Sequence, residues 1–110
     1  MSDRPLPKER PEPGYYYHYK HDPAGAINNY AYYIYGVGLH TEDDCRPEDQ
    51  CMMVYRPLYE SHVYKNGKLF DVRPLQMFYE PAHVGDREVI CFARIDDEAT
   101  LMQLREIKAR

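Results

Sequence analysis

Basic side chains that could bind an anion occur in several strand-like segments of this sequence. They are His18, Lys20, His40, Arg56 and Arg73. An arginine offers a planar fork that binds a carboxylate or a phosphate through two hydrogen bonds, and histidine and lysine add donors and charge. If these groups converge, they form an anion site, and Tyr19, Tyr55 and Tyr59 can stack a flat ring beside it. The alternative is structural, because each arginine precedes a proline and can pair with Glu42 or Asp71 at a strand end.

A histidine and a carboxylate also lie close together in His40-Thr41-Glu42. Such a pair can exchange protons in catalysis. Catalysis also needs a nucleophile or an activated water, and no nucleophile motif such as GxSxG accompanies the pair. A hydrogen-bonded turn at a strand end is the structural alternative. We therefore assign no catalytic residue and keep both side chains among the ligand-binding candidates.

Metal binding is a further possibility for the same region. Possible zinc ligands are His40, Cys45, Cys51 and His62. Possible ligands of a hard cation are Asp43, Asp44, Glu48 and Asp49. The first set lacks the paired spacing of zinc sites, and the second lacks an EF-hand register. The sequence also has no P-loop and no GxGxxG motif. We therefore expect neither a metal nor a cofactor, and we interpret the acidic loop as a solvated surface.

Composition limits the classes of protein that remain. The chain has 110 residues and a net charge of −4, and residues 41–50 account for that imbalance. A single domain is expected at this length. Nucleic-acid binding is disfavoured because it normally needs a basic face. No signal peptide is visible, and no apolar run approaches the ~18 residues of a membrane span. With three cysteines in no disulfide pattern, we expect a cytoplasmic protein that does not enter a membrane.

Local patterns predict a chain of short strands. The sequence has twelve tyrosines and no tryptophan, and tyrosine favours strands. Strands are predicted over residues 15–20, 29–40, 51–58, 69–73, 79–84 and 88–95, with a hairpin turn at Asn66-Gly67 and another at Gly85-Asp86. Residues 74–78 resemble one helical turn. A C-terminal helix is predicted over residues 98–109, with Asp96 or Asp97 as its N-cap and Leu101, Leu104 and Ile107 as its apolar stripe.

The first thirteen residues have a different composition. They contain four prolines and only two large apolar side chains, Met1 and Leu6. Such a segment buries too little surface to offset the entropy of ordering. We expect a disordered proline-rich arm whose removal through residue 12 leaves thermal stability nearly unchanged.

Four motifs together resemble a known bacterial family. They are His18-Tyr19-Lys20, Tyr32-x-Ile34-x-Gly36-x-Gly38-x-His40-Thr41-Glu42, Val54-Tyr55-Arg56-Pro57-Leu58-Tyr59, and Val72-Arg73-Pro74-Leu75-Gln76-Met77-Phe78. This pattern resembles the domain-of-unknown-function family DUF1653 over about residues 14–95. The chain departs from it by an insertion after Lys20, by a long acidic loop, and by Asp71 where an aromatic residue is usual. The resemblance implies an SH3-like β-roll and no established activity.

The same resemblance implies which face of the long strand is functional. The family's fixed positions fall on Tyr32, Ile34, Gly36, Gly38 and His40, which share one parity. We expect this side to face inward or toward a site. Under that interpretation Gly38→Val would overpack the opposite wall and cost on the order of 1–3 kcal/mol.

These observations predict an all-β fold: a small SH3-like roll or barrel at residues 14–95, a disordered arm at 1–13 and a short helix within 96–110. The expected function is that of a non-catalytic binding module for a small anionic, ring-bearing ligand such as a nucleotide. The ligand-binding candidates are His18, Tyr19, Lys20, His40, Glu42, Tyr55, Arg56, Tyr59 and Arg73. The alternatives are a protein-interaction module with an exposed tyrosine surface and, less favoured, an unrecognised hydrolase centred on His40 and Glu42.

Overall fold

The computed structural model describes residues 9–42, 44, 46, 50–59 and 70–109. Its strands are β1 (Gly14–His18), β2 (Ala31–Leu39), β3 (Cys51–Pro57), β4 (Asp71–Pro74), β5 (Ala82–Val84), β6 (Arg87–Val89) and β7 (Phe92–Arg94). Its helices are α2 (Gln76–Tyr79) and α3 (Glu98–Ala109). The predicted Asn66-Gly67 hairpin turn lies outside the described residues.

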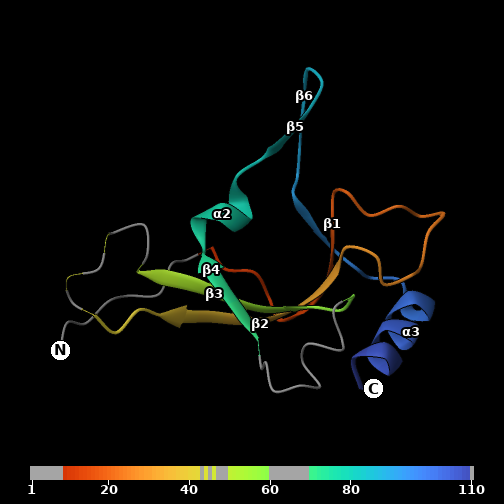
Figure 1. Cartoon of the computed structure of the whole chain (residues 1–110), viewed down its shortest axis with the longest axis horizontal. Helices are drawn as coiled ribbons and strands as arrows, with labels where there is room; N and C mark the ends of the chain where they lie inside the picture. Colours follow the sequence, from red (N-terminus) through yellow and green to blue (C-terminus); the bar gives the residue numbers. More distant parts are fainter. Residues whose placement is uncertain (1–8, 43, 45, 47–49, 60–69, 110) are drawn as a thin grey trace.

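The main sheet has five antiparallel strands in the order β4-β3-β2-β1-β7. The first four strands form a meander, and β7 returns along the outer side of β1 (Figure 1). Strands β4 and β7 are the two edges of this sheet, so the described strands do not close into a barrel. The prediction of a mostly β fold with a C-terminal helix is confirmed.

Each face of the main sheet carries its own apolar cluster. One cluster consists of Tyr16, Ile34, Met53, Leu75, Phe78 and Phe92, and we call its side the α2 face. The other consists of Ala31, Leu58, Ile95 and Leu104, and its side is the α3 face. Successive side chains of a strand point to opposite faces. Tyr16 therefore packs on the α2 face, whereas Tyr15 and Tyr17 pack on the α3 face.

Helix α3 begins and packs as the sequence predicts. The Oδ2 atom of Asp97 accepts hydrogen bonds from the backbone N of Thr100 at 2.9 Å and from its hydroxyl at 2.6 Å. These bonds lower the pKa of the Asp97 carboxyl, because they favour its charged form. Leu104 is fully buried, and Leu101 and Ile107 pack against the same cluster. The helix thereby covers the α3 face of the sheet.

A β-bulge in β2 overturns the expected common face of the long strand. Ile34 pairs with Tyr55, but Gly36 already pairs with Val54, so one extra residue is inserted between the two pairs. A bulge reverses the alternation of faces beyond it. Val37, rather than Gly36 or Gly38, therefore packs against the same cluster as Ile34.

The two glycines beyond the bulge are not covered by an opposite wall. A Cβ built on Gly36 would meet no atom within 4 Å, and one built on Gly38 would meet only Val54 Cγ2, at 3.7 Å. Overpacking at Gly38 is therefore not expected. Gly36 is required for a different reason, because its φ of +145° is a conformation that other residues rarely adopt.

The predicted last hairpin divides into two elements. Strands β5 and β6 pair only with each other, whereas β7 joins the main sheet beside β1. The backbone N of Tyr19 donates to the carbonyl of Cys91 at 2.7 Å, which holds the start of β7 in place. The β5–β6 hairpin projects away from the rest of the molecule (Figure 1).

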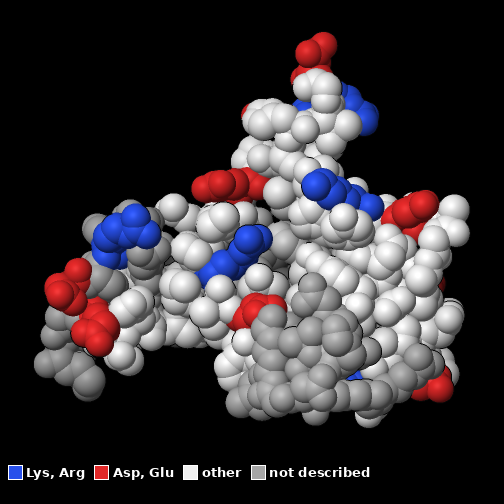
Figure 2. All heavy atoms as spheres, in the orientation of Figure 1, with Lys and Arg blue, Asp and Glu red and all other residues white. Residues whose placement is uncertain are grey.

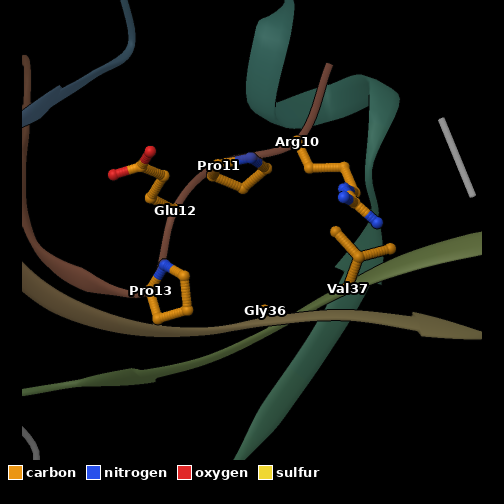
Figure 3. Close-up of a pocket in the computed structure, with 6 residues that line it drawn as sticks. All are labelled: Arg10, Pro11, Glu12, Pro13, Gly36 and Val37. Atoms are coloured by element: carbon orange, nitrogen blue, oxygen red, sulfur yellow. The ribbon is translucent and has the colours of Figure 1, made fainter. Parts of the chain in front are cut away.

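Residues 9–13, the described part of the proline-rich arm, lie against the main sheet. Pro11 is buried. The backbone carbonyl of Glu12 accepts a hydrogen bond from the Tyr16 hydroxyl at 2.8 Å, and its carboxylate contacts Arg94 at 3.3 Å. Between this segment and the bulge of β2 is a hollow of about 410 Å³ lined by Arg10, Pro11, Glu12, Pro13, Gly36 and Val37 (Figure 3). Disorder of residues 1–8 stays a prediction, because they lie outside the described residues.

Candidate functional site

The candidate site is a hollow of about 340 Å³ on the α2 face, which we call the aromatic hollow. It is lined by His18, Tyr32, Tyr55, Pro57, Tyr59, Asp71, Arg73 and Phe92. Every strand of the main sheet contributes at least one of these residues, and Tyr59 follows the end of β3. Strand pairing brings them together: His18 lies opposite Phe92, Tyr32 opposite Pro57, and Tyr55 opposite Asp71.

Tyr32 lies at the centre of the aromatic rings. Its ring centroid is 5.8 Å from that of Tyr55, 5.6 Å from that of Tyr59 and 5.5 Å from that of Phe92. The contacts with Tyr59 and Phe92 are edge-to-face, a favourable geometry for aromatic pairs. Phe92 also stacks on Phe78 of the buried cluster at 5.1 Å, which fixes the floor of the hollow to the core.

Two phenols in the hollow share one hydrogen bond. The hydroxyl oxygens of Tyr32 and Tyr59 are 2.7 Å apart. Burial, and then this bond, raises the pKa of Tyr32 well above its ordinary value. Only one of the two hydroxyls can donate to the other, so the second retains its proton for another acceptor. The pair can therefore offer one O–H donor to a ligand.

His18 contributes a neutral donor. Its Nδ1 accepts a hydrogen bond from the backbone N of Lys20 at 3.2 Å, so the neutral ring carries its proton on Nε2. Burial first, and then the positive charges of Lys20 and Arg73, hold the pKa of His18 below its ordinary value of 6.5. At neutral pH the imidazole therefore supplies an N–H group and no charge.

The two charged residues of the hollow come from β4. Asp71 and Arg73 both line it, whereas Val72 between them is exposed on the other side of the strand. Among the lining residues, Arg73 alone carries a permanent positive charge. The hollow therefore combines one guanidinium, one carboxylate and several aromatic rings.

Arg56 does not join Arg73. Because it lies one position beyond Tyr55 on β3, its side chain is on the α3 face, where it pairs with Tyr33. Its Nη1 atom lies 3.5 Å from the carbonyl of Lys108 in α3. The condition for an anion site with two arginines is therefore not met in the aromatic hollow, which Arg73 lines and Arg56 does not.

His40 and Glu42 also lie outside the lining of the aromatic hollow. They follow β2 beyond the bulge, where the Nδ1 atom of His40 accepts a hydrogen bond from the backbone N of Glu42 at 3.1 Å. Tyr19 and Lys20 are exposed beyond the end of β1; the Tyr19 ring lies 4.5 Å from that of His18, and the Lys20 ammonium lies 5.9 Å from the Tyr19 ring. Of the nine candidates, the hollow brings together His18, Tyr55, Tyr59 and Arg73.

Comparison with known proteins shows the family of this chain. A family model described as "Protein of unknown function (DUF1653)" matches residues 14–94. The chain belongs to the DUF1653 family. No curated protein and no solved structure matches it significantly. The family assignment confirms the resemblance found in the sequence motifs and brings no activity with it.

Four residues that line the aromatic hollow of this DUF1653 domain were not among the ligand-binding candidates predicted from the sequence. They are Tyr32, Pro57, Asp71 and Phe92. A signal was present for Tyr32, which has the same parity as Ile34 in a family motif. No local signal identifies Phe92, because only the pairing of β7 with β1 brings it to His18.

Among the described residues, no group of three or more His, Cys, Asp or Glu side chains has the arrangement of a metal site. Cys45, His62, Asp43, Glu48 and Asp49 lie outside that part. Cys51 and Cys91 are half-buried thiols outside any disulfide. None of the described helices has the length and apolar character needed to cross a lipid bilayer.

Proposed function

We propose that this DUF1653 domain is a non-catalytic binding module that takes a small anionic, ring-bearing ligand, such as a nucleotide, in the aromatic hollow. One observation carries the proposal: a single guanidinium, that of Arg73, lines the same hollow as the rings of Tyr32, Tyr55 and Phe92. A volume of about 340 Å³ lies at the lower end of the range of ~300–1,000 Å³ for small-molecule sites. It suits a ligand of about the size of a mononucleotide or smaller.

Each lining group has a role in this proposal. The Arg73 guanidinium binds the anionic group through charge-assisted hydrogen bonds. The ring of the ligand stacks among the side chains of Tyr32, Tyr55 and Phe92. The Nε2–H group of His18 and the remaining phenol proton donate to ring or sugar oxygens, because both donors belong to lining residues.

Asp71 restricts the kind of ligand. Its carboxylate lines the hollow together with Arg73, and a carboxylate repels a second negative charge. It can accept a hydrogen bond from an amino or ring N–H group. We therefore favour a ligand that combines a single anionic group with an N–H edge over a ligand that carries several anionic groups.

Two further inferences concern the finer fold class and the cellular compartment. We infer an SH3-like roll, which is supported by the four-strand meander and the return of the last strand beside the first. We infer a cytoplasmic location, which is supported by the two thiols outside any disulfide, because such thiols are typical of a reducing compartment.

The test compares three probes: adenosine monophosphate, adenosine and inorganic phosphate. Each is titrated into the full chain while backbone amide shifts and the melting midpoint are recorded. We expect the nucleotide to raise the midpoint, because binding stabilises the folded state, and to shift amides of β1, β4 and β7. Adenosine lacks the anionic group and phosphate lacks the ring. Each should therefore raise the midpoint less and cause smaller amide shifts than the nucleotide.

Two arginine variants separate the aromatic hollow from other basic surfaces. Arg73→Ala should weaken nucleotide binding on the order of tenfold or more, because a hydrogen bond to a charged group is lost. Arg87→Ala changes an exposed residue of the β5–β6 hairpin and should leave nucleotide binding unchanged. If all three probes leave the amides of the native chain unmoved, the small-anion proposal fails. Equal weakening by the two variants would show unspecific charge attraction instead.

A further inference from the structure

Tyr30, which directly precedes β2, has a backbone conformation that is unusual for its residue type. Its φ is +51°, and within the ranges that the structure describes it is the only residue other than glycine with a positive φ. Glycine adopts this left-handed conformation at no steric cost, whereas a large side chain rarely does. Such strain persists where the surrounding structure holds it, and it is found most often at functional sites.

Hydrogen bonds on both sides hold this strained turn. The carbonyl of Tyr30 accepts a hydrogen bond from the backbone N of His18 at 2.9 Å. The carbonyl of Asn28 accepts one from the backbone N of Ala31 at 3.2 Å. The side-chain Nδ2 of Asn28 donates to the carbonyl of Leu58 at 3.2 Å, and the backbone N of Leu58 donates to the carbonyl of Ala31 at 2.9 Å. The turn is therefore fixed between the end of β1 and the segment that follows β3.

This turn places the Tyr30 ring at the rim of the aromatic hollow. The ring centroid lies 5.6 Å from that of His18, in a stacked arrangement, and 5.8 Å from that of Tyr59. Both of these neighbours line the hollow. Tyr32 closes the circuit of four rings, at 6.4 Å from His18 and 5.6 Å from Tyr59. Because Tyr30 is still 39% exposed, its ring extends the aromatic wall outward and stays open to a ligand.

The loop that ends at Tyr30 presents little charge to a ligand. Asp22 is the only charged residue at positions 21–30 when histidine is counted as neutral. Its Oδ1 atom accepts a hydrogen bond from the backbone N of Ala24 at 2.9 Å, within the loop itself. The loop is the orange segment at the upper right of Figure 1, and that edge of the molecule is largely uncharged in Figure 2. Tyr30 therefore offers an aromatic face rather than a charge.

We propose that Tyr30 is a specificity-determining residue of the aromatic hollow and stacks on the ring of the bound ligand at the rim. The inference rests on the proposed function and divides recognition between two residues. Arg73 binds the anionic group, and Tyr30 recognises the ring. Glycine at position 30 would relieve the backbone strain but would remove this contact. The strained turn thus selects ligands with a flat ring over simple anions.

Two variants at this position separate the backbone from the ring. Tyr30→Ala removes the ring but keeps a Cβ on the strained backbone, whereas Tyr30→Gly removes both. Without ligand, Tyr30→Gly should have the higher melting midpoint of the two, because glycine adopts φ +51° freely. We expect this gain to exceed the cost of glycine's greater freedom in the unfolded chain. A glycine variant that melts no higher than the alanine variant would overturn the proposal.

Ligand binding is then measured by NMR titration of the full chain with adenosine monophosphate, adenosine and inorganic phosphate. Tyr30→Ala and Tyr30→Gly should each bind the nucleotide and the nucleoside on the order of tenfold more weakly than the native chain, because stacking on an aromatic ring is lost. Binding of phosphate should not change. Tyr30→Phe keeps the ring and should bind all three probes as the native chain does.

Tyr35 provides a matched control. It is 38% exposed, and its ring contacts Tyr33 of the α3 face at 4.9 Å. Tyr35→Ala should leave the binding of all probes unchanged. If the native chain binds the nucleotide and both ringless Tyr30 variants bind it equally well, the role of Tyr30 is wrong while the proposed function stands. If the native chain binds neither the nucleotide nor the nucleoside, the two proposals fail together.

Discussion

The hydroxyl oxygens of Tyr32 and Tyr59 lie 2.7 Å apart, although the two residues are 27 positions apart in the chain. Tyr32 is the more buried of the two, and Tyr59 is 40% exposed. The hydrogen bond therefore connects the centre of the aromatic hollow to its rim, and its two ends differ in their access to water.

This difference predicts unequal costs for removing either hydroxyl. Tyr59→Phe removes the partner of the half-buried Tyr32 hydroxyl and should cost about 0.5–1.5 kcal/mol. Tyr32→Phe leaves the exposed Tyr59 hydroxyl to bond with water and should cost less. Urea denaturation of both variants measures the two free energies. A larger loss for Tyr32→Phe would show that its hydroxyl is satisfied in some other way.

Stability should also fall at high pH because of Tyr32. Its pKa is raised in the folded state, mainly by burial, so the unfolded chain loses its proton first. The stabilisation from the neutral phenol is fully present below the ordinary tyrosine pKa of 10.0 and is lost as the pH rises above it. Denaturation midpoints measured across this range should decline less steeply for Tyr32→Phe than for the native chain.

His18 predicts a decline at the acidic side. Its pKa is lowered in the folded state by burial and by the charges of Lys20 and Arg73, so the unfolded chain takes up the proton first. Its contribution is present above pH 6.5 and is lost as the pH falls below that value. Arg73→Gln removes one of the opposing charges, so the NMR titration midpoint of His18 should move upward. An unchanged midpoint would show that Arg73 does not act on this imidazole.

The bulge predicts opposite tolerance at two neighbouring glycines. Gly36→Ala places a Cβ on a backbone with φ +145° and should cost about 1–3 kcal/mol through backbone strain. Gly38→Ala adds a Cβ at ordinary contact distance, 3.7 Å, from Val54 Cγ2 and should be nearly neutral. Urea denaturation of the two variants gives the comparison. Equal costs at both positions would mean that the strand runs without the bulge.

Residues 9–12 should contribute to stability. A chain that begins at Glu9 keeps the buried Pro11, the Tyr16–Glu12 hydrogen bond and the Arg94–Glu12 ion pair. A chain that begins at Pro13 loses all three, and its melting midpoint should be lower by several degrees, since about 1 kcal/mol shifts the midpoint of a domain of this size by ~4–8 °C. The exposed ion pair adds little to this effect. Equal midpoints would support the original expectation of a dispensable arm.

Much of the fold was predictable from the sequence because the signals are local. Alternating tyrosines indicate β1, the apolar run from Ala31 indicates β2, and Asp97 with Leu101, Leu104 and Ile107 indicates a capped helix that packs on one side. Each of these patterns depends on residues a few positions apart. The family could also be recognised, because its motifs are contiguous segments of the chain.

The tertiary structure alone decided which side chains meet. Alternation tells which residues of one strand share a face, but it does not tell how that face is aligned with the next strand. A single extra residue before Gly36 separates the face of Ile34 from that of Gly38, although the two have the same parity in the sequence. One position on β3 separates Tyr55 in the aromatic hollow from Arg56 under α3. Long-range pairing then brings Phe92 beside His18. Such pairing depends on the packing of the whole sheet, so Arg73 meets His18 and three tyrosines instead of the second arginine.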